Sequence, residues 1–269
     1  MKAPLIAAFV LIAAAASAQT PRLSNGRIEP HTTTNIARDV QQLASTLTEP
    51  AWIGYTQPLI DGDHNMCDYT TINGRMITQS TDPIHLEPVG YFFVMFRVEE
   101  KQITRIRTFS ENCPLDAGGK AVHWFNNVPV SDSVNYMKTF MSPAATRRLN
   151  DSAVTVIAMT KGDQALNELL TIAKNGATPQ AKGNALFWLA QRAGDKAVGT
   201  ITAAIENDPD TEVKKKAVFA LSHFSAWEFP ALFLFGLGAA VLAVRTGRLG
   251  PGIVAHLGFN AVAAFFLLR

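Results

Sequence analysis

A stretch of sequence recurs after 32 residues in the second half of the chain, between about residues 150 and 222. Residues 185–190 (ALFWLA) align with residues 217–222 (AVFALS), and residues 153–158 align one period earlier. Pro179 and Pro209 fall in the turns between the apolar segments, where a helix cannot continue. Such a repeat predicts an α-helical solenoid over residues 149–222, in which each helix pair buries its apolar face against neighbouring pairs.

The sequence before the repeat has a different character. Residues 91–98 and 102–109 have the composition and the alternation of strands, and the polar residues 99–101 between them predict an antiparallel hairpin. Apolar side chains at helical spacing predict an amphipathic helix over residues 36–47. Residues 19–148 are therefore predicted to form a small α+β domain, and no residue set within them has the pattern of a catalytic site.

The amino end has the features of a secretory signal. Lys2 precedes an uncharged apolar run over residues 5–15, and Ala16-Ser17-Ala18 supplies the small residues of a cleavage site. The alternative is a buried or membrane-spanning helix, but the run is about half of the ~20 residues that a span requires. Residues 1–18 are predicted to be a signal peptide, so the mature chain is expected to be exported.

Two cysteines follow the predicted signal, Cys67 and Cys113. An exported protein enters an oxidising compartment, where an even number of cysteines usually pairs. An intramolecular disulfide between Cys67 and Cys113 is the natural prediction.

Charge and motif patterns argue against several binding functions. The chain has 24 Lys and Arg against 22 Asp and Glu, and its longest basic run is only residues 214–216, so nucleic acid is not an expected partner. Residues 61–65 begin like a calcium loop, but Met66 and Ile72 stand where that loop needs Gly and Glu, which favours a solvated polar loop.

The histidines of the first half show no ligand spacing. His31, His64, His85 and His123 are scattered along the sequence and are expected to be surface or partly buried side chains. We therefore expect no metal and no cofactor.

The carboxyl end departs from the repeat. Apolar runs over residues 229–244 and 253–268 contain no charged side chain and are joined by residues 245–252, which are rich in Gly and Arg and include a Pro. Each run is slightly shorter than a comfortable span. Residues 223–269 predict a pair of membrane helices. The alternative, a buried helical pair, would need a larger core than this chain supplies.

The repeat resembles a known architecture. Residues 150–222 resemble HEAT-like repeats of the short bacterial variety, with a phenylalanine-containing second helix as in residues 185–191. Residues 19–222 as a whole resemble exported bacterial HEAT-repeat proteins. This resemblance implies a surface that binds another protein, and it provides no catalytic residues.

The carboxyl end carries a second resemblance. Residues 219–223 fit F-x-x-x-H and residues 256–260 fit H-x-x-x-N. With the sequence between these motifs, residues 217–269 resemble the end of the CAAX-protease and bacteriocin-processing (CPBP) family of intramembrane proteases. The resemblance implies that His223 positions the catalytic water and that His256 and Asn260 stabilise the oxyanion. Alternatively, these side chains pair with one another between packed helices.

The general base of that family is missing from the pattern. Its E-E-x-x-x-R motif has no match, because Arg105 is one position too far from Glu99-Glu100. The acidic residue nearest to His223 in the sequence is Glu228. The favoured function is an exported interaction protein that is tethered to membrane lipid, with its repeat on the outer side. The alternative is a CPBP-type intramembrane endopeptidase.

Overall fold

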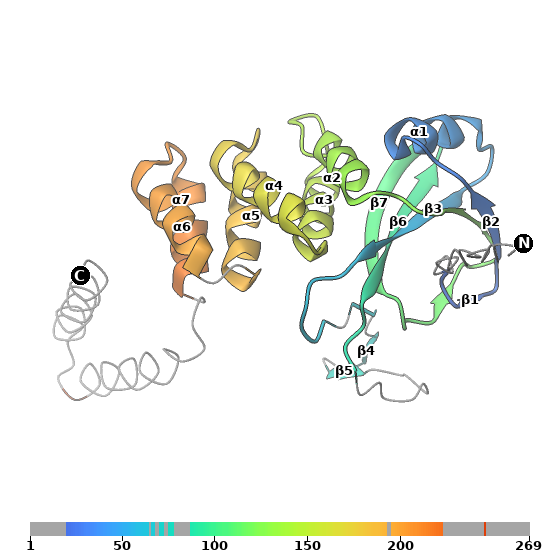
Figure 1. Ribbon diagram of the computed structural model, residues 1–269, viewed down its shortest axis with the longest axis horizontal. Helices are drawn as coiled ribbons and strands as arrows, with labels where there is room; N and C mark the ends of the chain where they lie inside the picture. The colour runs from blue at the N-terminus through green and yellow to red at the C-terminus, as the bar shows by residue number, and fades with distance from the viewer. Residues whose placement is uncertain are drawn as a thin grey trace, which may run out of the picture.

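The computed structural model describes residues 20–64, 66–67, 70–72, 75–77, 87–192, 195–222 and Arg245. A sheet region occupies one end of the described molecule and a stack of helices the other (Figure 1). The strands are β1 (Leu23–Ser24), β2 (Arg27–His31), β3 (Ala51–Pro58), β4 (Thr70–Ile72), β5 (Arg75–Ile77), β6 (Tyr91–Glu99), β7 (Gln102–Ser110), β8 (Leu115–Asp116) and β9 (Ala121–Phe125). The helices are α1 (Ile36–Thr46), α2 (Val130–Thr139), α3 (Arg147–Met159), α4 (Asp163–Asn175), α5 (Pro179–Arg192), α6 (Asp195–Asn207) and α7 (Thr211–Ser222). The predicted α+β class is confirmed.

The main sheet is mixed, with strand order β2-β9-β3-β6-β7. β9 pairs in parallel with both β2 and β3, whereas β6 is antiparallel to β3 and to β7. The predicted hairpin is β6–β7, and it turns through Glu100 and Lys101, both at positive φ. Short pairs β1–β8 and β4–β5 lie outside this sheet.

Strand β6 is buried on both faces, which explains its unbroken apolar run. Successive side chains of a strand point to opposite faces. Phe92, Val94 and Phe96 belong to a core on the helix side of the sheet, here called the helix-side core. Phe93 and Met95 belong to a second core on the other face, together with Cys113. We call this second cluster the disulfide-side core.

The predicted disulfide is present and closes the disulfide-side core. Cys67 and Cys113 are bonded, with Cα atoms 5.4 Å apart. Cys113 is buried, and Cys67 packs against the same cluster. The covalent link therefore ties the segment after β3 to the segment after β7.

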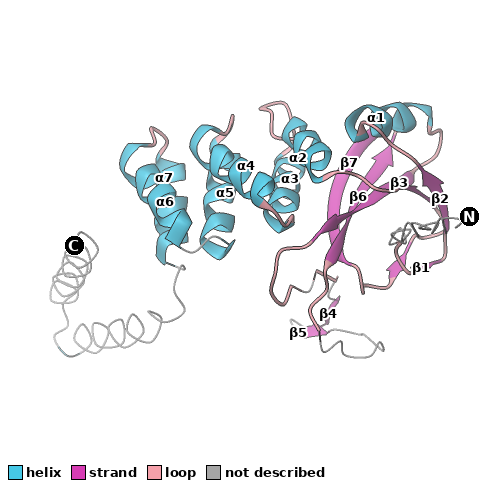
Figure 2. Ribbon diagram, in the orientation of Figure 1, coloured by secondary structure: helices cyan, strands magenta, loops and turns pink. Residues whose placement is uncertain are grey.

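Helix α1 covers the helix-side core and closely matches its predicted range (Figure 2). Asn35 caps its first turn by accepting a hydrogen bond from the Arg38 backbone N–H. Ile36, Val40 and Ala44 form its buried stripe, at the spacing expected of an amphipathic helix.

The helical stack follows the period seen in the sequence. α3, α5 and α7 begin at Arg147, Pro179 and Thr211, each 32 residues after the last, and α4 and α6 begin at Asp163 and Asp195, also 32 residues apart. α5 packs between α3 and α7, and α4 packs on α6. Helices one period apart are therefore neighbours in space.

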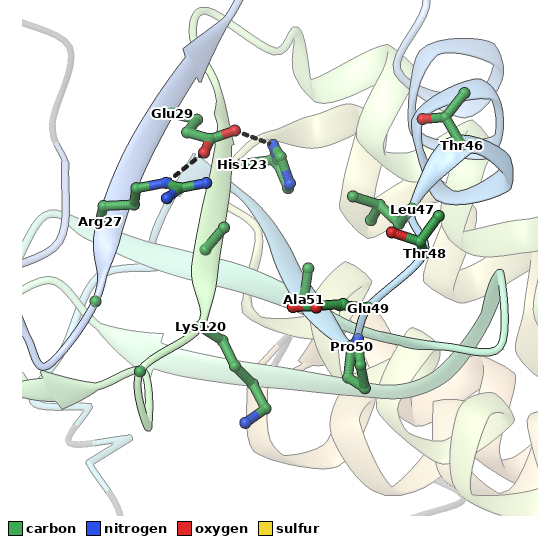
Figure 3. A pocket seen from close by; sticks show the side chains of 13 residues that line it. Arg27, Glu29, Thr46, Leu47, Thr48, Glu49, Pro50, Ala51, Lys120 and His123 are labelled. Carbon is green, nitrogen blue, oxygen red and sulfur yellow. Dashed lines mark hydrogen bonds and ion pairs between the residues drawn. The ribbon is translucent and has the colours of Figure 1, made fainter.

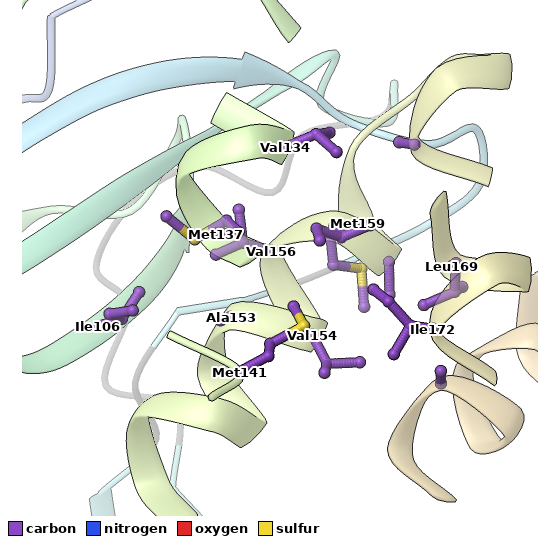
Figure 4. Packing of buried hydrophobic residues seen from close by; sticks show 14 of the residues in the cluster. Ile106, Val134, Met137, Met141, Ala153, Val154, Val156, Met159, Leu169 and Ile172 are labelled. Carbon is purple, nitrogen blue, oxygen red and sulfur yellow. The ribbon is translucent and has the colours of Figure 1, made fainter. Parts of the chain in front are cut away.

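The sheet region and the stack share one core. The helix-side core continues from the sheet through α2, α3 and α4, and Figure 4 shows Ile106, Met137, Val156 and Leu169 within it. Backbone bonds add to this packing, because Ile60 N–H donates to Met159 C=O and Lys161 N–H donates to Pro58 C=O. The first helices of the stack are thus fixed to the end of β3.

Some predicted segments lie outside the described residues. These are the signal peptide over residues 1–18 and, apart from Arg245, the membrane pair over residues 223–269. No helix within the described ranges is both long enough and apolar enough to span a bilayer.

Candidate functional site

The parallel pair β2–β9 brings together three side chains that are distant in sequence. Glu29 lies opposite His123 in this register. Val122 and Trp124 point into the disulfide-side core, so His123 between them points to the other face. Glu29 and His31, two residues apart on β2, share that face by the same alternation. We call Glu29, His31 and His123 the His–Glu cluster.

The three side chains of the His–Glu cluster are in contact. His31 Nε2 lies 3.1 Å from His123 Nδ1, and the same Nδ1 lies 3.2 Å from Glu29 Oε2. The second oxygen of Glu29 accepts a hydrogen bond of 2.6 Å from Arg27 Nε. One possible ligand atom from each of these three side chains lies within 4.8 Å of the other two, and the described ranges contain no second such group of three or more His, Cys, Asp or Glu side chains.

The surroundings of the cluster set its protonation states. The hydrogen bond from Arg27 lowers the pKa of Glu29, which is ionised at neutral pH. Burial lowers the pKa of His123, against the opposing effect of the Glu29 carboxylate. Burial thus favours the neutral form of the His123 ring, and the neutral imidazole is the form that binds metals.

A cavity of about 690 Å³ lies beside the cluster, between the end of α1 and the strands β2, β3 and β9 (Figure 3). Its lining residues are Gly26, Arg27, Glu29, Thr46, Leu47, Thr48, Glu49, Pro50, Ala51, Gly119, Lys120, Ala121 and His123. Glu29 and His123 are in direct contact at the wall of this cavity, and the Glu29 side chain is 34% exposed. Water and small solutes can therefore reach the cluster.

The sequence did not reveal this cluster. His31 and His123 are 92 residues apart, and we expected both to be surface or partly buried side chains without ligand spacing. The contact depends on β9, a five-residue strand that the sequence did not predict, and on its pairing with β2. A strand assignment over residues 121–125 would have shown that His123 faces away from Val122 and Trp124, but not which residues it meets.

The structure does not describe the side chains that the CPBP resemblance points to. His223, His256 and Asn260 are outside the described residues. The Glu-Glu pair considered for the missing base lies at the β6–β7 turn, where Arg97 Nε donates to Glu99 at 3.0 Å. Glu99 is thus part of an ion pair on the hairpin.

Comparison with known proteins identifies a similarity at the carboxyl end. Residues 214–262, 49 of the 269 in the chain, match the family model described as Type II CAAX prenyl endopeptidase Rce1-like. No curated protein and no solved structure matches the chain. The matched range includes His223, His256 and Asn260 and begins within α7. The carboxyl end is therefore similar to part of a CAAX-protease family.

Proposed function

We propose that the protein is an exported, membrane-tethered interaction protein whose HEAT-like helical stack binds another protein. The observation that carries this proposal is a set of neighbouring aromatic side chains on α5 and α7, of which Phe219 is half exposed and the others are partly buried. It consists of Phe187, Trp188 and Phe219, here called the aromatic row.

The aromatic row follows the repeat. Phe187 and Phe219 occupy equivalent positions 32 residues apart, and their rings are stacked with centroids 6.5 Å apart. Trp188 meets Phe187 edge-on at 5.3 Å. Phe219 is 50% exposed and its neighbour Val218 is 52% exposed. Val218 and Phe219 thus present apolar surface to solvent on α7, beside the partly buried rings of α5.

The side chains of α7 differ in burial. Ala217 and Ala220 are fully buried, whereas the Phe219 ring stacks on Phe187 of α5 and stays half exposed. Burying Phe219 would remove more apolar area from water than burying either alanine. Half of the Phe219 side chain remains exposed, and aromatic side chains are enriched at the centres of protein interfaces.

The tether is proposed from the sequence. The signal-like residues 1–18 would deliver the chain out of the cytoplasm, and the apolar runs 229–244 and 253–268 would hold it at the membrane. The stack would then lie on the outer side, next to the bilayer, where α7 leads into the apolar tail. The partner would be a protein that presents apolar side chains at that surface.

A photo-crosslinking experiment tests the interaction. We expect benzoylphenylalanine at position 219 of the full-length protein, expressed in its native membrane, to give one dominant adduct. The matched control places the same group at Lys174, an exposed position on α4. Phe187→Ala should reduce the adduct at position 219. Equal labelling from positions 174 and 219, or none from position 219, would refute the proposal.

A second function is supported by the family match over residues 214–262. In an intramembrane endopeptidase, His223 would position water while His256 and Asn260 stabilise the oxyanion. Hydrolysis also needs a base near that water, and the matched residues contain a single acidic side chain, Glu228. We therefore rank this function second.

Purified full-length protein in detergent distinguishes the two functions. The interaction proposal predicts no cleavage of prenylated or membrane-anchored peptides. Turnover that is abolished by His223→Ala and retained by His64→Ala would establish the protease function instead. Glu228→Gln would then show whether that acid is the base.

A further inference from the structure

We propose that Glu29, His31 and His123 bind a zinc ion at the wall of the cavity beside α1. These residues do not belong to the aromatic row. The donor set is two imidazole nitrogens and one carboxylate oxygen, which together form a familiar three-ligand zinc set.

The distances fit a common metal ion. Zinc binds imidazole nitrogen and carboxylate oxygen at about 2.0–2.2 Å, so neighbouring ligand atoms of a tetrahedral site are about 3.3 Å apart. The two contacts of His123 Nδ1 are 3.1 Å to His31 Nε2 and 3.2 Å to Glu29 Oε2. All three ligand atoms lie within 4.8 Å. Small side-chain rotations would bring them round one ion.

Hydrogen bonding alone leaves the cluster poorly satisfied. Both short contacts use Nδ1 of His123, which carries at most one proton. Suppose first that both rings are neutral and that His123 Nδ1 carries the proton. If His31 Nε2 is unprotonated, it competes with Glu29 Oε2 to accept this proton. If His31 Nε2 is protonated, two N–H groups face each other. If His123 Nδ1 carries no proton, its lone pair faces a carboxylate oxygen. A cation removes this conflict, because all three atoms can then point lone pairs at it.

The surroundings hold the ligands and leave one position open. Arg27 holds the other oxygen of Glu29 at 2.6 Å, an outer contact of the kind that orients metal-binding carboxylates. The ring of His31 packs against Phe125 with centroids 5.3 Å apart. Glu29 and His123 line the cavity, so water from it can complete a four-coordinate site.

The ligand types favour zinc over the common hard cations. Calcium and magnesium prefer six or more oxygen ligands or retained waters, and this site offers one carboxylate. Imidazole suits zinc and its transition-metal neighbours. The cysteines do not compete, because Cys67 and Cys113 are joined in the disulfide.

The test is metal content of the full-length protein purified in detergent. The protein is stripped with a chelator, incubated with zinc chloride and dialysed, and zinc is measured by mass spectrometry. Cobalt substitution adds a spectroscopic readout, since a tetrahedral nitrogen and oxygen site gives intense visible bands. We expect one zinc ion per chain in the wild type and none in His31→Gln or Glu29→Gln.

Controls separate this site from other histidines and from misfolding. His64→Gln changes a histidine whose Nε2 lies near the Asp61 carbonyl, and it should retain the zinc. The double variant His223→Ala/His256→Ala should also retain it. Circular dichroism must show that His31→Gln is folded, and Glu29→Gln repeats the test at a second ligand. No bound zinc in the wild type, or equal zinc in wild type and both ligand variants, would overturn the proposal.

Discussion

Phenylalanine side chains have opposite environments at the two ends of the described molecule. On β6, Phe92, Phe93 and Phe96 are buried, and between them they enter the cores on both faces of the sheet. On the stack, Phe219 is half exposed, although α7 packs closely on α5. The same residue type thus serves the interior in one region and the surface in the other.

The difference follows from which side chains make the contacts between elements. The sheet is covered on both faces, so successive positions of its inner strand β6 are apolar. The stack mixes buried alanines, such as Ala181, Ala185 and Ala217, with larger buried side chains, such as Leu186 and Leu189. Its last helix leaves Phe219 half exposed, so the sheet region is expected to supply the buried aromatic contacts and the end of the stack to supply surface.

Truncation of a sheet phenylalanine should have the largest effect. Phe93 is 1% exposed and meets Trp124 edge-on with ring centroids 5.3 Å apart. Phe93→Ala should lower the free energy of unfolding by about 3–5 kcal/mol, because it leaves a cavity in the disulfide-side core. Urea unfolding followed by tryptophan fluorescence measures this. A loss below about 1 kcal/mol would contradict the assignment of the stabilising core to the sheet.

Loss of the disulfide should have the next largest effect. The bond between Cys67 and Cys113 closes a loop with a sequence separation of 46 residues. By loop entropy, Cys67→Ala/Cys113→Ala should lower the free energy of unfolding by about 3–4 kcal/mol. Hydrogen exchange should detect the loss in β3, β6 and β9 under conditions in which α5 to α7 keep their protection. A uniform loss would mean that the two regions unfold as one unit.

The features that could be predicted from sequence depend on near neighbours. The β6–β7 hairpin needs a two-residue turn, and α1 needs one apolar stripe. The 32-residue helix spacing is present directly in the sequence. The disulfide followed from a count of two cysteines in a chain with a signal-like start.

The features that were missed depend on pairing between distant strands. β9 is a short apolar run that contains a histidine, and such runs do not distinguish strand from helix. Its parallel partners, β2 and β3, lie 70 or more residues earlier, so the register Glu29↔His123 is a tertiary property. The His–Glu cluster could not be inferred without that register. The roles of His223, His256 and Asn260 stay predictions.

Acid should affect the two regions through different carboxylates. In the stack, burial raises the pKa of Asp208, but the stronger combined effect of its hydrogen bonds, chiefly from Lys182 at 2.8 Å, lowers it. In α1, hydrogen bonds from Arg38 and Thr33 lower the pKa of Asp39 to about 2. Each depressed pKa contributes stability that is full above about pH 4 and is lost as the pH falls through the folded pKa.

Two matched variants measure this contribution. Asp208→Asn should lower the free energy of unfolding at pH 7 by about 1–2 kcal/mol, because it weakens a charged hydrogen bond between Lys182 and a buried side chain. It should also flatten the pH dependence of stability below pH 4. Asp39→Asn should flatten the same range through α1 alone. An unchanged acid slope in Asp208→Asn would show that the Lys182 pair contributes nothing to the stack.

Truncation of the exposed phenylalanine should have the smallest effect on folding. Phe219 is 50% exposed, so Phe219→Ala removes little buried area and should change the free energy of unfolding by about 1 kcal/mol or less. Phe93→Ala, for which we expect a several times larger loss of unfolding free energy, is the reference variant in the urea unfolding experiment. Binding of the partner protein should respond in the opposite order. Phe219→Ala should weaken binding because it removes a ring of the aromatic row, whereas Phe93 lies in the interior and its loss removes no partner contact. A Phe219→Ala protein that is as unstable as Phe93→Ala would show that the row serves the fold of the stack rather than an interface.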